Sequence, residues 1–265
     1  MTFGTTSSGT FYFFNKKEQS IPIVFVHGVG LTHEIWQPQL DFFKKYSTLS
    51  YDILGHGKTP LEKKEISFDD FSDQLVKLID ELKIDKIHLV GFSIGSLIAR
   101  NFATKFNNRL QSLILLGSIY KRSDEQQKIV NVRFNQAKKE LKLSKEALKR
   151  WFSDKYLEKN PNTYEKIVSI LSANNMKNFL KVYELFVIHK NDEDFEKIIV
   201  KTLIMTGEYD TGSTVKMSEE LNKIIKNSQI KIINNGKHLC GIECADDVNL
   251  TIKDFIEKNE WFKTL

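Results

Sequence analysis

The sequence predicts an α/β protein with a mostly parallel, doubly wound sheet, and three observations lead to this fold class. Short apolar runs of strand length alternate with amphipathic, helix-length segments over residues 1–118. Over residues 119–196 only helix-period segments remain, and the alternation resumes over residues 197–265. An all-helical block inside such an alternation is typical of an insertion. We therefore expect a core of 1–118 and 197–265 that carries a helical cap, or lid, at 119–196.

Each element of the core follows from its own pattern. Residues 21–27 (IPIVFVH) form a continuous apolar run, as expected of a strand that is buried on both faces. Residues 67–82 place their apolar side chains on one stripe of a helix. The other expected strands are 10–14, 48–52, 86–91, 112–117, 201–207 and 229–233. The other expected helices are 34–45, 94–106, 215–226 and 246–260.

The composition is that of a folded, lysine-rich protein. Of 265 residues, 41% are hydrophobic and 28% charged, which excludes wholesale disorder. Lys and Arg number 39 against 34 Asp and Glu, and only five of the 39 are arginines. No block of five like charges occurs. We interpret the excess as a solvated surface and expect no nucleic-acid partner.

We find no signal for a membrane span, for secretion or for a disulfide framework in the sequence. No apolar run approaches the roughly 20 residues needed to span a bilayer, so we expect no membrane partner. The first ten residues have neither a basic start nor an apolar stretch, which predicts a cytoplasmic protein. Cys240 and Cys244 are too few for a disulfide framework, and we expect free thiols in a reducing compartment.

The pentapeptide at 91–95 (GFSIG) lies between an expected strand and an expected helix. A G-x-S-x-G sequence in this position is typical of a sharp turn that exposes a nucleophilic serine, here Ser93. Small flanking residues relieve the crowding of such a turn. The start of the helix also brings backbone N–H groups and a positive dipole end close to the serine.

The segment His27-Gly28-Val29-Gly30 ends the first apolar strand. A loop in this position supplies one N–H of an oxyanion hole, and the residue after the nucleophile supplies the other, so Val29 and Ile94 are the candidates. A dinucleotide-binding G-x-G-x-x-G would need a third glycine where His33 stands, and we reject it.

Two other motifs fail on inspection. Gly57-Lys58-Thr59 imitates the end of a phosphate-binding loop, but Asp52 occupies the position of its first glycine. We expect a tight turn there, with His56 in a structural role. No group of His, Cys or carboxylate residues has metal-ligand spacing, so we expect neither a metal nor a cofactor.

A serine nucleophile needs a base, and the base needs a residue that orients it. His238 follows the last expected strand, and the catalytic loops of such a sheet lie at the carboxyl ends of its strands. The acid should follow another strand, where Asp210 is the first choice and Glu208 the alternative. His88 lies within the alternating pattern of an expected strand, and we expect it in the core. The order Ser93, Asp210, His238 is the one that this architecture uses.

With these residues in place, the chain resembles the α/β-hydrolase fold superfamily along nearly its whole length. The matching segments are HGVG at 27–30, YDILGHGKT at 51–59, GFSIGS at 91–96, TGEYD at 206–210 and GKH at 236–238. The pattern looks most like the capped esterases, lactonases and C–C hydrolases, whose cap is inserted after the sixth strand. Ser96 and Thr59 depart from a frequent glycine and a frequent serine. Ser93 in place of an aspartate argues against the dehalogenase and epoxide-hydrolase relatives.

The resemblance implies a carboxylesterase-like enzyme that acts on a small acyl substrate. Ser93 would be the nucleophile, His238 the base, Asp210 the orienting acid, and Val29 and Ile94 the oxyanion donors. Hydrolysis of a C–C bond or an enol-lactone on the same scaffold remains open, as does a non-catalytic receptor for a small ligand. The oligomeric state and the natural substrate are open as well.

Residues within 119–196 are expected to set substrate choice, because a cap over the strand ends must roof Ser93. Its aromatic residues bury the cap's own faces or line the acyl pocket, and include Phe134, Trp151, Phe152, Phe179, Tyr183 and Phe186. Residues 118–196 hold 16 Lys and Arg against 12 Asp and Glu, a net charge of +4. This charge would attract an anionic substrate, but we favour a solvated face.

Overall fold

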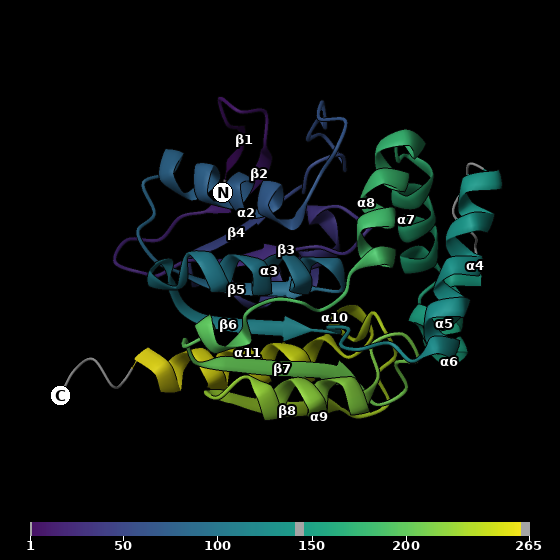
Figure 1. The fold of residues 1–265 in the computed structure, drawn as a ribbon. Coiled ribbons are helices and arrows are strands. Elements are labelled where there is room, and N and C mark those ends of the chain that lie inside the picture. Colours follow the sequence, from purple (N-terminus) through teal and green to yellow (C-terminus); the bar gives the residue numbers. More distant parts are fainter. Residues whose placement is uncertain (1, 141–145, 261–265) are drawn as a thin grey trace.

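The computed structural model describes residues 2–140 and 146–260, and a single eight-stranded sheet runs through them. The strand order is β1-β2-β4-β3-β5-β6-β7-β8 (Figure 1). The β1–β2 and β2–β4 pairs are antiparallel, and all other neighbours are parallel. The strands are β1 (Thr2–Thr5), β2 (Phe11–Asn15), β3 (Ile23–Val26), β4 (Thr48–Tyr51), β5 (Ile87–Phe92), β6 (Leu110–Leu116), β7 (Thr202–Gly207) and β8 (Ser228–Ile233).

Helices cover both faces of this sheet, and each face has its own hydrophobic core. One core joins the sheet to α2 (Phe68–Glu81), α3 (Ile94–Lys105) and α9 (Val215–Ile224). The other joins it to α1 (Gln37–Phe42) and α11 (Ala245–Glu260). Successive residues of β3 enter opposite cores, which is why its sequence is apolar without alternation.

Between β6 and β7 the described residues form helices and no strand. The insertion contains α4 (Asp124–Glu140), α5 (Glu146–Trp151), α6 (Asp154–Lys159), α7 (Pro161–Ser172) and α8 (Met176–Ile188), followed by the short 3-10 helix η3 (Phe195–Lys197). These helices lie at the ends toward which the arrows of β6 and β7 point in Figure 1. The insertion therefore lies at the carboxyl ends of the parallel strands.

The fold class and the expected core elements agree with the structure, apart from a divided helix, an edge strand and two short helices, η2 (Asn107–Arg109) and α10 (Cys240–Glu243), that were not expected. The expected helix at 34–45 is two pieces, the 3-10 helix η1 (His33–Trp36) and α1, because Pro38 suits the first turn of a new helix. The edge strand β1 was not expected, since its polar sequence TFGT is mostly exposed. Gly4 allows Tyr12 to cross this strand, since a Cβ there would lie 2.4 Å from the Tyr12 hydroxyl.

Within the described residues, we find no helix with both the length and the apolar character required to cross a membrane.

Candidate active site

Ser93 stands alone between the end of β5 and the start of α3, in a strained backbone conformation. Its φ of 55° and ψ of −119° lie where L-residues are rarely found. The turn needs glycine on both sides. A Cβ at Gly91 would lie 2.2 Å from the Gly95 carbonyl oxygen, and one at Gly95 would lie 2.3 Å from the Val26 carbonyl oxygen. The G-x-S-x-G spacing thus follows from the close passage of β3, β5 and α3.

His238 lies between Ser93 and Asp210 and contacts both. Its Nδ1 lies 2.7 Å from Asp210 Oδ2, and its Nε2 lies 3.3 Å from Ser93 Oγ. Because the carboxylate can only accept, Nδ1–H donates to Asp210 and Nε2 is left to accept from the Ser93 hydroxyl. The second oxygen of Asp210 accepts the amides of Gly212 and Ser213 at 2.8 and 2.9 Å. The three side chains form one hydrogen-bonded series.

Glu208, the alternative acid, does not reach His238. Its Oε2 accepts the amide of Asn235 at 2.9 Å on the exposed side of the turn. The loop that contains Gly236 and Lys237 comes close to the end of β7 because Gly207 has no side chain. A Cβ at Gly207 would lie 2.4 Å from the carbonyl oxygens of both Gly236 and Lys237. Sequence alone left the two carboxylates open, and this geometry selects Asp210.

The loop after β3 is folded closely against Ser93. A Cβ at Gly28 would lie 3.3 Å from Ser93 Cβ. The Gly30 amide donates to His56 Nε2 at 2.8 Å. Among the described residues, the amides of Val29 and Ile94 have no such acceptor, and Val29 lines the same cavity as Ser93. These two amides are therefore available to an oxyanion.

Buried histidines support this loop as neutral side chains. His56 Nδ1 lies 3.2 Å from the Leu54 carbonyl oxygen, and His27 Nε2 accepts the Ile53 amide at 3.1 Å. Burial lowers the pKa of His56 to about 3 and that of His27 to about 4. His56 is structural, as expected from its place in a tight turn.

The two departures from the family pattern, and His88, have local roles. Ser96 donates from its hydroxyl to the Ser93 carbonyl at 2.5 Å. Thr59 Oγ1 accepts the Phe11 amide at 3.0 Å, which joins the turn to β2. His88 is buried and its Nδ1 lies 2.7 Å from Ser112 Oγ, so it belongs to the core as expected.

A cavity of about 350 Å³ opens above Ser93 and is walled mainly by the insertion. Four of the six aromatic residues singled out from the sequence line it, namely Trp151, Phe179, Tyr183 and Phe186. The other two, Phe134 and Phe152, are buried in the packing between elements. The volume of this cavity suits a small organic substrate.

Contacts between the insertion and the catalytic loops were not foreseen from the sequence. Asn174, which follows α7, donates from Nδ2 to the Gly30 carbonyl at 2.7 Å. The Leu239 amide, next to His238, donates to the Trp151 carbonyl at 3.0 Å. Both use backbone acceptors, which leave no signature in side-chain type. They fix the cavity wall to the two loops that flank Ser93.

The described part of the chain offers no cluster of three or more metal-ligating side chains. Both cysteines are free thiols. Burial raises the pKa of Cys240 well above its ordinary value and that of Cys244 to about 11. Neither thiol is therefore a nucleophile at neutral pH.

The sequence matches the family of the alpha/beta hydrolase fold over residues 21–243. The chain belongs to this family. Together with the fold and with relatives that are themselves hydrolases, this membership makes the protein a hydrolase.

Two relatives from Acinetobacter baylyi (strain ATCC 33305 / BD413 / ADP1) match this hydrolase along most of their length. The (E)-2-((N-methylformamido)methylene)succinate hydrolase is 26% identical over 261 residues, or 97% of each chain. The 3-oxoadipate enol-lactonase 1 is 27% identical over 230 residues, or 86% of each chain. Among solved structures, the enol-lactonase from Burkholderia xenovorans LB400 has a TM-score of 0.86 at 22% identity and covers 97% of this chain and 100% of its own.

Proposed function

We propose that this hydrolase cleaves a carboxylic ester or a related acyl bond through an acyl-enzyme on Ser93. The observation that carries the proposal is the series Asp210–His238–Ser93, joined by hydrogen bonds of 2.7 and 3.3 Å at the base of a cavity. A serine beside a histidine that is itself held by a carboxylate is the arrangement that activates a hydroxyl for attack.

In the first half of the reaction, the Ser93 hydroxyl attacks the acyl carbon and its proton passes to His238 Nε2. Asp210 holds Nδ1–H and stabilises the imidazolium that forms. The amides of Val29 and Ile94 donate to the oxyanion of the tetrahedral intermediate. His238 then protonates the leaving group, which yields an acyl-enzyme.

In the second half, His238 accepts a proton from water as the water attacks the acyl-enzyme. The second tetrahedral intermediate uses the same two amides. It collapses as His238 Nε2 returns the proton to Ser93 Oγ, which breaks the bond to the acyl carbon, releases the acid and regenerates the serine hydroxyl.

We further propose that residues 119–196 act as a cap domain over a core of 1–118 and 197–265. The support is that four aromatic residues of the insertion line the cavity, while the hydrogen-bonded series comes from the core. In this arrangement the core performs the chemistry and the cap selects the substrate.

The experiment is burst-phase hydrolysis of p-nitrophenyl acetate by the wild-type protein and by Ser93→Ala. We expect a burst close to one equivalent of nitrophenol from the wild type, and a roughly 10⁴-fold lower kcat for Ser93→Ala with an unchanged circular dichroism spectrum. Near-wild-type turnover by a folded Ser93→Ala would refute the assignment. A wild-type protein that binds but never hydrolyses any ester would indicate a receptor.

An enol-lactone is the second candidate substrate. It is favoured by the similarity to 3-oxoadipate enol-lactonase 1, which extends over 86% of this chain. Opening a lactone uses the same attack and the same oxyanion donors, but the leaving group stays attached to the acyl chain. A panel of simple esters and enol-lactones, compared by kcat/KM, distinguishes the two.

A further inference from the structure

Arginine is concentrated at the cavity. The chain has five arginines, and three of them, Arg122, Arg133 and Arg150, line the cavity that contains Ser93. Arginine stays charged at any physiological pH, and its planar fork matches a carboxylate in two parallel hydrogen bonds. The lysines, by contrast, do not line this cavity in the described part of the chain.

Arg133 lies in the middle of the face that α4 turns toward the cavity. Cavity-lining positions on α4 recur at helical spacing, at Gln126, Ile129, Val130, Arg133, Gln136, Ala137 and Glu140. Within residues 2–140 and 146–260, Arg133 has no hydrogen bond or ion pair. Glu140, the carboxylate at the end of this face, accepts from Gln136 Nε2 at 3.1 Å. Arg133 is thus a cation without a protein counter-ion in the described structure.

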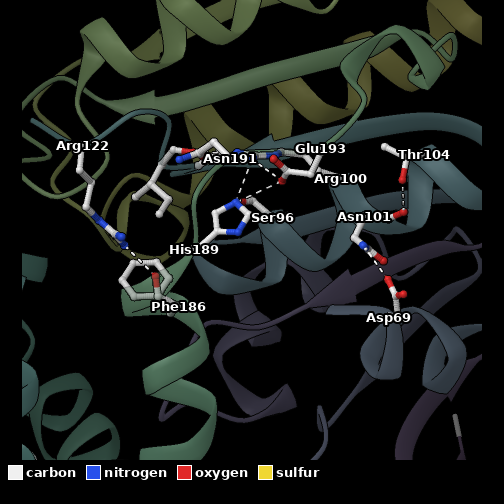
Figure 2. A network of polar contacts seen from close by, with 12 residues as sticks. Asp69, Ser96, Arg100, Asn101, Thr104, Arg122, Phe186, His189, Asn191 and Glu193 are labelled. Carbon is white, nitrogen blue, oxygen red and sulfur yellow. Dashed lines mark hydrogen bonds and ion pairs between the residues drawn. The ribbon is translucent and has the colours of Figure 1, made fainter. Parts of the chain in front are cut away.

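Arg122 is held rigidly by neutral groups at the end of α8. Its guanidinium donates to the carbonyls of Phe186 at 3.1 Å and Val187 at 3.2 Å, and lies 4.5 Å from the centre of the Phe186 ring (Figure 2). Burial lowers the pKa of Arg122 to about 10, so it remains charged at neutral pH. A partly buried cation that no described carboxylate pairs with is costly, and an anionic ligand would remove that cost.

The three charges act on one point of the cavity wall, the phenol of Tyr183. Burial raises the pKa of Tyr183, and the charges of Arg133, Arg150 and Arg122 each oppose that rise. Residues from the loop before α4, the middle of α4 and the end of α5 therefore direct positive potential at the same region. We expected the excess charge of residues 118–196 on a solvated face, and in part it belongs to the cavity.

We propose that the cavity binds acyl substrates that carry an additional ionised carboxylate, which Arg122 and Arg133 recognise while Ser93 attacks the acyl carbon. Arg150 adds to the positive potential. The inference rests on the proposed function, since it names the class of substrate that this hydrolase would cleave.

The test compares esters with their neutral isosteres. One series has the carboxylate in the acyl part: mono-4-nitrophenyl esters of dicarboxylic acids from glutarate to suberate, each paired with the methyl ketone in which a methyl group replaces one carboxylate oxygen. The other has it in the leaving group: 4-acetoxybenzoate paired with its methyl ester. We expect kcat/KM to favour the carboxylate by roughly 10- to 100-fold in one series, as charge-assisted hydrogen bonds allow. Raising the salt concentration should reduce this preference.

The variants assign the preference to particular side chains. Arg133→Gln should lower kcat/KM for the carboxylate ester at least tenfold and change that for its isostere less than twofold. Arg122→Lys keeps the charge but loses the fork, so it should lower the same ratio without requiring a neutral residue in a half-buried site. Lys128→Gln is the control, because it removes one positive charge from an exposed position of α4 that does not line the cavity.

Three results would overturn the inference. The first is a wild type that shows no preference for the carboxylate in either series. The second is an Arg133→Gln variant in which kcat/KM falls equally for the carboxylate ester and its neutral isostere. The third is a Lys128→Gln variant that lowers the ratio of these two kcat/KM values as much as Arg133→Gln does. A normal burst with neutral esters and no carboxylate preference would remove this inference alone. A folded Ser93→Ala that retains full turnover would remove the proposed function and the inference together.

Discussion

Asp210 is fixed by more than its contact with His238. One carboxylate oxygen accepts the histidine Nδ1–H, and the other accepts two backbone amides of its own turn. Three hydrogen bonds to the charged form leave the carboxylate little freedom to rotate, so the imidazole is presented to Ser93 in one orientation. Glu208, two residues earlier, uses its carboxylate to hold the amide of Asn235.

The two carboxylates should therefore differ sharply on mutation. Asp210→Asn leaves His238 in the wrong tautomer, and we expect kcat to fall roughly 10⁴-fold. Glu208→Gln still accepts a hydrogen bond from Asn235 and should lose less than about tenfold. Steady-state kinetics on p-nitrophenyl acetate measure both. A greater loss in Glu208→Gln would show that the wrong acid was assigned.

Gly207 controls how closely the loops of Asp210 and His238 approach. In Gly207→Ala the added Cβ would lie 2.4 Å from two carbonyl oxygens, so the loops must separate. We expect about 1–3 kcal/mol of lost stability and roughly 100-fold lower kcat/KM from the displaced base. Gly212→Ala is the matched control, since its Cβ would lie 3.5 Å from Asp210 Oδ1, an ordinary contact. Urea unfolding and kinetics should separate the two variants; equal behaviour would contradict the argument.

At the scale of single residues, the sequence predicts the residues of the proposed chemistry better than the residues that line the cavity. Ser93, Asp210 and His238 could be found because each follows a recognisable strand, and parallel strands bring their carboxyl ends to one edge. Arg122 and Arg133 could not be assigned to the cavity. The position of Arg133 depends on which face of α4 packs inward, and a lysine-rich amphipathic segment does not specify that. The position of Arg122 depends on its contacts with the end of α8, which lies far away in the sequence.

Among the elements, α3 has a second role besides presenting Ser93. Its buried Arg100 donates to the carbonyl of Ile119 at 2.7 Å, at the start of the insertion, and forms an ion pair with Glu193, close to the end of the insertion (Figure 2). His189, at the end of α8, lies 3.2 Å from the same carboxylate. One side chain of α3 therefore holds both ends of the insertion.

Glu193→Gln should destabilise the protein strongly, because Arg100 is completely buried and would lose its counter-ion. Breaking such a pair costs about 3–5 kcal/mol, which urea unfolding measures. The control is Asp69→Asn on α2, whose carboxylate forms an ion pair with Lys105 of the same helix α3. Its partner Lys105 is 40% exposed and Asp69 itself 54%, so that variant should lose less than about 1 kcal/mol. Similar losses in the two variants would show that the buried pair is not a structural anchor.

Most elements could be predicted because their periodicity is strong, and the exceptions have physical causes. The strand β1 carries too few apolar side chains to show alternation, and it is held by pairing with β2 rather than by burial. At the break between η1 and α1, Pro38 allows a new helix to start, and Trp36 is almost fully buried in the core at this point. Such tertiary contacts are not encoded in local propensity.

For the whole molecule, the buried histidines His27 and His56, which lie at and against the loop after β3, make stability dependent on pH. Burial lowers the pKa of His27 to about 4 and of His56 to about 3, against an unfolded value of 6.5. Below pH 6.5 the unfolded chain binds protons that the native state does not. The contribution of these neutral histidines is thus complete above about pH 6.5 and is lost as the pH falls toward 4.

We expect the free energy of unfolding to decrease with falling pH by up to about 1.4 kcal/mol per pH unit for each histidine. Urea unfolding at pH 7.5, 6.0 and 5.0 measures this slope. His56→Gln keeps an acceptor for the Gly30 amide but cannot titrate, so its slope should be shallower than that of the wild type. Identical slopes would mean that protonation of His56 does not limit stability.

The position of the insertion has a consequence for folding. The strands β6 and β7 are neighbours in the sheet, yet residues 117–201 separate them in the chain. Joining strands across roughly 85 residues rather than 15 adds only about 1.5 kcal/mol of loop-closure entropy, because the cost rises by about 0.6 kcal/mol per doubling. The sheet can therefore accommodate insertions of very different length at this point, and new specificities can arise there while the strand ends that hold Ser93, Asp210 and His238 stay unchanged.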